Sequence, residues 1–160
     1  MRKIIPIIIL TLLVMVGCTT LDCPLNNTVY TKYKLDGNIK QLTNDTLTIS
    51  IHRVDGEDSI LINKMEKADS FMLPMSYAGG EDSLFFEVKD NLKRVFKDTV
   101  TVKKENQNHF ESVDCSPAIF HTITDVKTTH HLIDSIVINQ KDVNFDATKT
   151  HFLIYFGTRN

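Results

Sequence analysis

Tryptophan is absent from this chain of 160 residues, and cysteine is scarce, with three residues. The first absence removes the Cys-Trp-Cys arrangement of antibody-type domains. A surplus of positive charge is also missing, because 18 Lys and Arg face 20 Asp and Glu. This mildly acidic balance argues against nucleic acid as a partner. The length suits one domain with its own core.

Sequence motifs of known catalytic sites are missing as well. The chain has no G-x-S-x-G, S-x-x-K or H-E-x-x-H motif and no glycine-rich phosphate loop. Gly79 and Gly80 precede two acidic residues, which would repel phosphate, so we interpret them as a turn. The acidic groups at 55–58 and 81–82 lack the alternating ligands of a calcium loop, and we expect solvated turns there. We predict neither catalytic residues nor a cofactor, and the protein is not expected to be an enzyme.

The histidines are scattered through the sequence. Metal sites need ligands that converge, often at short spacing. His130 and His131 would point to opposite faces if they lie on a strand. We therefore favour separate surface or cleft histidines over a metal site, although an approach of His121 to His151 across neighbouring strands stays open. The six are His52, His109, His121, His130, His131 and His151.

The longest apolar run is too short to span a membrane. Arg2 and Lys3 precede the run 4–16, whereas a bilayer needs roughly 20 apolar residues. A secretory signal is the better interpretation than a transmembrane anchor. The junction Met15-Val16-Gly17-Cys18 resembles the lipobox of bacterial lipoproteins. The resemblance implies cleavage before Cys18 and lipid on its sulfur.

The expected organisation is a lipoprotein signal peptide at 1–17, a short lipidated tether at 18–24 and one β-rich domain at 25–160. Cleavage would leave 16 Lys and Arg against 20 Asp and Glu. Thr19 is not the Asp that, by resemblance to well-studied lipoproteins, marks retention in the inner membrane. No acidic run of the surface-export type follows Cys18. We therefore expect a domain that is anchored in the outer membrane and faces the periplasm.

Cys23 and Cys115 remain once Cys18 carries lipid. An exported compartment is oxidising, so one disulfide between them is the simplest interpretation. Closing so long a loop would stabilise the fold by roughly 4 to 5 kcal/mol, less any strain. Two free buried thiols are the alternative, because sequence cannot show whether the two Cα atoms come within bridging distance.

The pattern of apolar and polar residues after the tether is typical of short β-strands. Apolar and polar residues alternate from Leu47 to Ile51, which indicates a strand with one buried face. Asp55-Gly56 favours a two-residue hairpin turn. That turn would pair Ile51 with Ile60, Ile49 with Ile62 and Arg53 with Asp58.

Similar stretches recur along the chain, and no window shows a convincing helical stripe. Regular short strands with turn signals between them predict an all-β immunoglobulin-like β-sandwich of about eight strands. The further stretches are 28–35, 70–73, 83–88, 99–103, 118–126, 133–138 and 151–156.

A short pattern of Asp, Ser or Thr, and an apolar residue occurs five times. The simplest interpretation is that Asp closes a turn and the hydroxyl residue opens a strand. The pattern also resembles the O-glycosylation motif of Bacteroidetes envelope proteins. The five begin at Asp45, Asp58, Asp82, Asp98 and Asp134.

Longer motifs suggest a family. The stretches 22–29, 110–115, 133–136 and 151–156 resemble a family of uncharacterised Bacteroidetes envelope lipoproteins. The resemblance implies a β-rich lipoprotein of the cell envelope and transfers no active site. We expect a protein-interaction module whose partners are the bilayer, through Cys18, and an envelope or outer-membrane protein or its assembly machinery. A glycan-binding lipoprotein is the alternative, weakened by the absence of tryptophan.

Overall fold

The chain forms two β-sheets that pack face to face. The computed structural model describes residues 23–52, 56 and 58–157. All regular secondary structure in these ranges is β-strand. The all-β prediction is therefore confirmed. Within the described residues no helix is long and apolar enough to cross a membrane. The strands are β1 (Tyr30–Asp36), β2 (Thr46–His52), β3 (Asp58–Glu66), β4 (Ser70–Pro74), β5 (Glu81–Lys89), β6 (Val95–His109), β7 (Ala118–Thr128), β8 (Ile133–Ile138), β9 (Asp142–Val143) and β10 (Phe152–Phe156).

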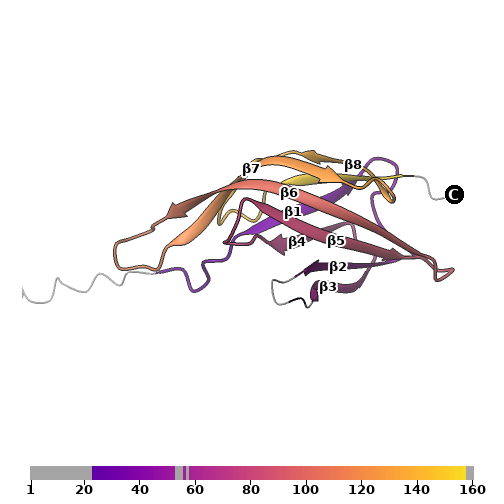
Figure 1. Cartoon of the computed structure of the whole chain (residues 1–160), viewed down its shortest axis with the longest axis horizontal. Helices are drawn as coiled ribbons and strands as arrows, with labels where there is room; N and C mark the ends of the chain where they lie inside the picture. Colours follow the sequence, from indigo (N-terminus) through magenta and orange to yellow (C-terminus); the bar gives the residue numbers. More distant parts are fainter. Residues whose placement is uncertain (1–22, 53–55, 57, 158–160) are drawn as a thin grey trace, which may run out of the picture.

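One sheet has four strands in the order β4-β1-β10-β8, and the other has six in the order β3-β2-β5-β6-β7-β9. The first described strand pairs in parallel with the last, Tyr33 lying opposite Phe152. The other pairings are antiparallel. Figure 1 shows the long β5 and β6 running along the longest axis of the molecule. The domain is therefore elongated along these strands, with its two ends at the two ends of β5 and β6 (Figure 1).

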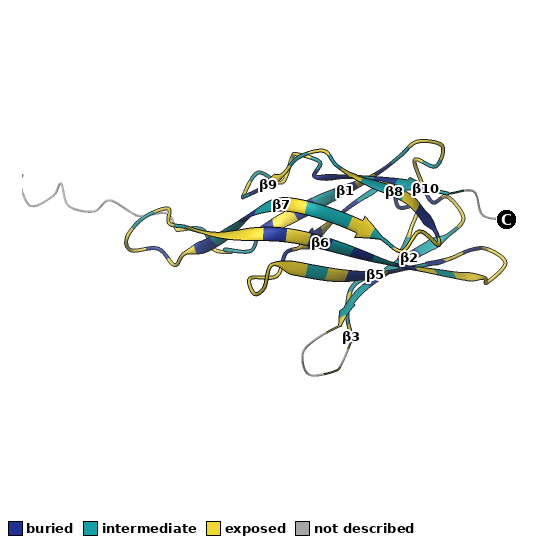
Figure 2. Cartoon of the chain, turned by 45° about the horizontal axis from the view of Figure 1, so that its top comes forward, coloured by how far each residue is buried: buried dark blue, intermediate teal, exposed yellow. Residues whose placement is uncertain are grey.

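Alternating burial explains why these segments pack as two layers. Along β5, Leu84, Phe86 and Val88 are buried, whereas the residues between them are not. Figure 2 shows the same alternation of colours along β5. Side chains of a strand point to opposite faces in turn, so each sheet presents an apolar face to the other.

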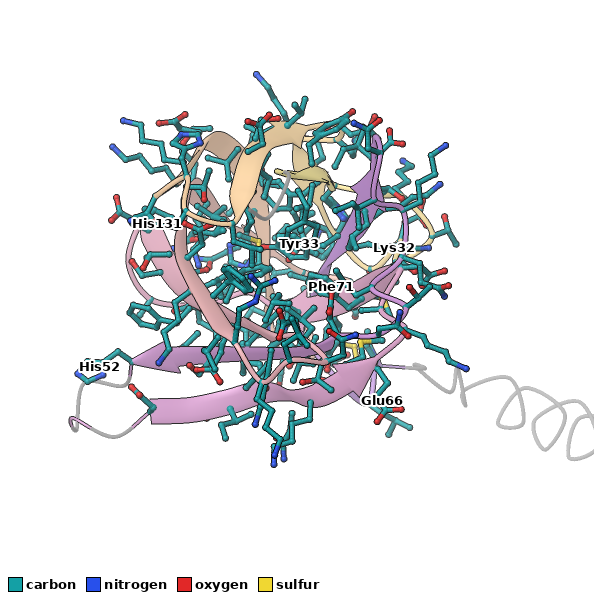
Figure 3. All side chains as sticks on the ribbon, turned by 90° about the vertical axis from the view of Figure 1, so that its right-hand side faces the viewer. Lys32, Tyr33, His52, Glu66, Phe71 and His131 are labelled. Atoms are coloured by element: carbon teal, nitrogen blue, oxygen red, sulfur yellow. A yellow bond between two sulfur atoms is a disulfide. The ribbon has the colours of Figure 1, made fainter. Side chains whose placement is uncertain are left out.

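Aromatic rings form the centre of the core. The Tyr33 ring stacks on Phe152 at 4.7 Å between centroids and on Phe71 at 5.2 Å, and Phe86 approaches it edge-on at 6.4 Å. Figure 3 shows Tyr33 and Phe71 in the middle of the molecule. Burial raises the pKa of the Tyr33 hydroxyl far above its usual range, despite the neighbouring Thr31 hydroxyl. Rings of this size supply much of the buried apolar area.

The β2–β3 hairpin departs from the predicted register. Ile49 lies opposite Ile62, as predicted, but Ile51 lies opposite Ser59 rather than Ile60. The pairing shifts between Ile49 and Ser50, because an irregularity in the ladder takes up one residue there. Arg53 and Asp55 fall outside the described residues. Asp58, the predicted partner of Arg53, lies opposite His52 instead.

A disulfide fastens the start of the described chain to the connection between β6 and β7. Cys23 and Cys115 are bonded, with Cα atoms 5.5 Å apart. Asn27 Nδ2 adds hydrogen bonds to the carbonyl oxygens of Ser116, at 3.1 Å, and Pro117, at 3.3 Å. We call residues 23–27 and 109–117 the disulfide end, which lies at one extremity of the long axis in Figure 1.

Candidate functional site

A groove of about 510 Å³ lies on the outer face of the six-stranded sheet, over β2, β5 and β6. Pairing aligns its side chains in two rows across these strands. Ser50, Phe85 and Thr99 form one row. The groove is lined by Thr48, Ser50, His52, Asp58, Phe85, Phe86, Glu87, Lys97, Asp98, Thr99, Thr129 and His131.

The second row carries charge. Thr48, Glu87 and Lys97 lie opposite one another. Lys97 Nζ is 3.1 Å from Glu87 Oε2, and both side chains are solvent-accessible. An exposed ion pair adds little to stability, so these charges remain available to a ligand. The two rows therefore combine an accessible ring, three hydroxyls and one cation-anion pair.

Phe85 is the apolar centre of the groove. Its position in β5 points away from the core, and the side chain is 38% exposed. The flanking Ser50 and Thr99 sit on neighbouring strands, within cross-strand contact range of the ring. A ring between hydroxyls offers both an apolar surface and hydrogen-bonding groups.

Two histidines mark the borders of the groove. His52 Nδ1 lies 2.8 Å from Asp58 Oδ1 at the β2–β3 hairpin. His131 Nδ1 lies 3.4 Å from Asp98 Oδ1 on the connection from β7 to β8. Figure 3 shows His52 and His131 on the same side of the molecule. Both imidazoles are exposed, and each has a carboxylate beside it.

Asp98 holds the far wall of the groove in place. Its buried carboxylate accepts hydrogen bonds from the backbone N–H groups of His131 at 2.9 Å, Leu132 at 2.6 Å and Ile133 at 2.6 Å, and from the Thr129 hydroxyl. Burial opposes ionisation, but these donors outweigh it and hold the pKa of Asp98 below its usual range. The carboxylate has enough partners to be structural, and it fixes the loop that carries His131.

A buried polar cluster lies between the sheets, on the other face of β6. Lys104 Nζ is wholly buried and donates to Asp82 Oδ2 and, at 2.7 Å, to the Ser76 carbonyl oxygen. Burial lowers the pKa of Lys104, while Asp82 opposes the shift. The expectation that Asp82 lies in a solvated turn is therefore wrong, because it is the counter-ion of a buried lysine. Gly79 does lie in a turn, with φ of 72° and its carbonyl oxygen bonded to Asn106 at 2.8 Å.

His121 belongs to the same cluster. Its Nδ1 lies 2.7 Å from Asn106 Oδ1, and its Nε2 is buried without a hydrogen-bond partner among the residues that the structure describes. Burial, with the nearby Lys104 ammonium, lowers the pKa of His121 to about 4. The imidazole is therefore neutral at neutral pH.

The remaining histidines are dispersed. His109 stacks on Phe120 at the disulfide end, with ring centroids 4.1 Å apart. His130 accompanies His131 on a loop, not a strand. His151 is buried, with Nδ1 accepting the Lys32 N–H at 3.0 Å, and burial lowers its pKa. In residues 23–52, 56 and 58–157, no three His, Cys, Asp or Glu side chains gather closely enough to hold a metal ion.

The sequence-predicted residues have different outcomes. Cys23 and Cys115 are joined, whereas Cys18 lies outside the described residues. Four of the five hydroxyl residues after Asp lie within the first three residues of a strand; Thr99 is the exception, because β6 starts at Val95. The groove was not predicted. Its outward positions alternate in the sequence, but only the structure places β2 beside β5.

Fold and groove together define a class, a two-sheet β protein with a disulfide at one end and a polar groove on one face. The chain matches a family of unknown function (DUF6452) over residues 46–156, and it belongs to that family. The match takes in β2 to β10, and hence the three strands beneath the groove. Comparisons with curated proteins and with solved structures found no match.

Proposed function

We propose that this protein is a non-catalytic interaction module with an immunoglobulin-like sandwich, anchored in the outer membrane by lipid on Cys18 and facing the periplasm. It is an envelope lipoprotein of the Bacteroidetes type. Its groove takes a segment of a protein partner, such as an outer-membrane protein or its assembly machinery. The two cross-strand rows, with Phe85 at their centre, carry this proposal.

The composition of the groove favours a protein segment. Phe85 offers an apolar contact, and aromatic residues are enriched at protein interfaces. Ser50 and Thr99 can bond a backbone, while Lys97 and Glu87 can pair with charged side chains. The open outer face of a sheet leaves room for such a segment to lie across the strands.

The position of the groove limits where the partner must reach. Thr99 and His109 are ten residues apart in β6, about 33 Å at the rise of a strand. The tether from Cys18 to Cys23 spans at most about 17 Å. With the disulfide end nearest the membrane, the groove stands some tens of ångströms from the lipid. A periplasmic segment of the partner fits that height.

Site-specific photo-crosslinking tests the proposal. A photoreactive amino acid replaces Thr99 in the full-length chain, and the matched control replaces Met72, which is 50% exposed on β4 of the other sheet. We expect one discrete adduct in intact cells from position 99, absent from position 72 and lost when Phe85→Ala is added. Equal adducts from both positions, or no adduct from position 99, would contradict it.

A second candidate is glycan binding, favoured by the accessible Phe85 ring between the Ser50 and Thr99 hydroxyls. Apolar faces of sugars can stack on a ring while hydroxyls bond their rims. A glycan array on the mature protein separates the two candidates. Sugar binding that disappears in Phe85→Ala and survives in Met72→Ala would replace the protein partner with a glycan.

A further inference from the structure

Three large apolar side chains project into solvent at the disulfide end. Leu25 is 107% exposed, Val113 97% and Phe110 61%. The exposed large apolar residues of the strands are less exposed, from 36% at Tyr30 to 56% at Ile60. Large contiguous apolar surface on a folded protein marks a site of interaction with a partner or a membrane.

The covalent structure keeps two of these side chains near one another. Leu25 follows Cys23 by two residues, and Val113 precedes Cys115 by two. Since the bonded cysteines have Cα atoms 5.5 Å apart, each side chain starts within roughly 7 Å of the bridge. Cys115 N–H donates to the Ser112 carbonyl oxygen at 3.2 Å, which folds this segment into a turn.

Stacked rings and hydrogen bonds anchor the disulfide end. His109 stacks on Phe120, and Phe145 meets the Phe120 ring edge-on at 5.1 Å. Asn27 ties the opposite segment to Ser116 and Pro117. The apolar side chains are thus presented by an anchored end of the domain.

The charge of this end restricts what it can touch. Residues 23–27 and 109–117 contain Glu111 and Asp114 and neither Lys nor Arg. His109 Nε2 lies 3.0 Å from Glu111 Oε1. Peripheral binding to anionic lipid relies on Lys and Arg, so this surface suits a zwitterionic headgroup layer.

We infer that the disulfide end is a membrane-contact surface, in which Leu25, Phe110 and Val113 enter the interfacial layer of a zwitterionic bilayer. The inference rests on the proposed lipid anchor, because Cys18 lies only five residues before Cys23. An acyl chain at that distance holds this end against the headgroups. Partial burial of the three side chains adds a second attachment, and stable binding to membranes commonly takes two.

Because the chain has no tryptophan, the fluorescence of one introduced Trp reports contact with lipid at that position alone. Val113→Trp introduces the only indole of the chain at the disulfide end, and Leu92→Trp introduces one in the turn between β5 and β6, where Leu92 is 69% exposed. Each full-length lipidated protein is reconstituted in phosphatidylethanolamine and phosphatidylcholine vesicles with brominated acyl chains. We expect blue-shifted emission and bromine quenching for Val113→Trp, and neither for Leu92→Trp.

A second measurement tests the side chains themselves. The mature chain 18–160 with Cys18→Ser, which carries neither the signal peptide nor lipid, is titrated with the same vesicles, with and without Phe110→Ser and Val113→Ser. Replacement should weaken partitioning on the order of tenfold for each side chain that enters the interface. Leu92→Ser, the control at the other end, should leave partitioning unchanged.

The outcomes separate the anchor from the contact surface. Wild type that does not float with vesicles overturns lipid anchoring, and the Cys18→Ser titration then decides the contact surface alone. Protein that floats while Val113→Trp stays unquenched overturns the contact surface and leaves the anchor standing. In that case the apolar end faces a protein rather than lipid.

Discussion

Four hydrogen bonds hold the buried carboxylate of Asp98. Three backbone N–H groups and one hydroxyl point at a carboxylate that is only 3% exposed. In the sequence, Asp98 is one of five Asp residues that precede Ser or Thr and an apolar residue. Its burial was not visible in that pattern, because its donors lie over 30 residues further along the chain.

We predict that Asp98→Asn lowers the free energy of unfolding by about 1 to 3 kcal/mol, since the amide keeps one acceptor and sets an NH₂ against N–H donors. Urea unfolding measures the loss. Asp134→Asn, at an exposed position of β8, is the control and should change little. Equal stability of the two variants would contradict a structural role for Asp98.

We also predict that the contribution of the Asp98 carboxylate to stability depends on pH. Its folded pKa lies below the unfolded value of about 3.9, so its contribution is full above that value. The contribution is lost as pH falls toward the folded pKa. We expect the stability gap between wild type and Asp98→Asn to narrow below about pH 4. A gap that stays constant down to acid unfolding would contradict this.

A second prediction about pH concerns a base, the His121 imidazole. Its folded pKa is about 4 against an ordinary value of 6.5, so the unfolded chain binds more protons between these values. Stability associated with this residue is kept above pH 6.5 and is lost as pH falls toward 4. In an NMR titration the His121 ring should stay neutral at pH 5.5. A His121 ring that is protonated at this pH would show that it is not desolvated.

At the scale of strands, alternation of apolar residues predicts where strands lie better than where they end. β8 has the predicted bounds, whereas β6 extends well beyond the predicted 99–103. Its final segment, 104–109, has no apolar residue. Lys104 nevertheless occupies an inward position there, because Asp82 and Ser76 satisfy its ammonium. A pattern that counts only apolar side chains cannot show such a pairing between strands.

The groove could not be predicted from the sequence, for a related reason. Ser50, Phe85 and Thr99 can each be assigned to an outward face from sequence alternation. Their alignment depends on which strands are neighbours, and β3 and β4 intervene in the chain between β2 and β5. The register change in β2–β3 likewise depends on a local irregularity that no turn signal announced.

We predict that reduction of the disulfide lowers the free energy of unfolding by a large amount. It joins residues 92 positions apart, and closing a loop of that size stabilises a fold by roughly 4 to 5 kcal/mol through loss of entropy in the unfolded chain. The double variant Cys23→Ser, Cys115→Ser should match reduced wild type in urea unfolding. Mass spectrometry of a non-reduced digest should show the two peptides linked. Two freely alkylated thiols at these positions would contradict the bond.

For the whole molecule, anchoring is the first question to test. We predict that Cys18→Ser gives an unprocessed precursor without lipid, because Val16-Gly17-Cys18 ends a short apolar run. Metabolic labelling with a fatty-acid probe measures it. Cys23→Ser is the matched control and should label like wild type. Equal labelling of the Cys18 variant would remove the anchor.

The parallel pairing of β1 with β10 has a consequence for the order in which the molecule is made. Tyr33 needs Phe152 beside it, so the four-stranded sheet cannot close until β10 has been synthesised. Pairings between distant segments make folding slow. Until β10 arrives, β1 keeps one edge open and its aromatic ring only partly covered. The four-stranded sheet is therefore the part of the described fold that is completed last.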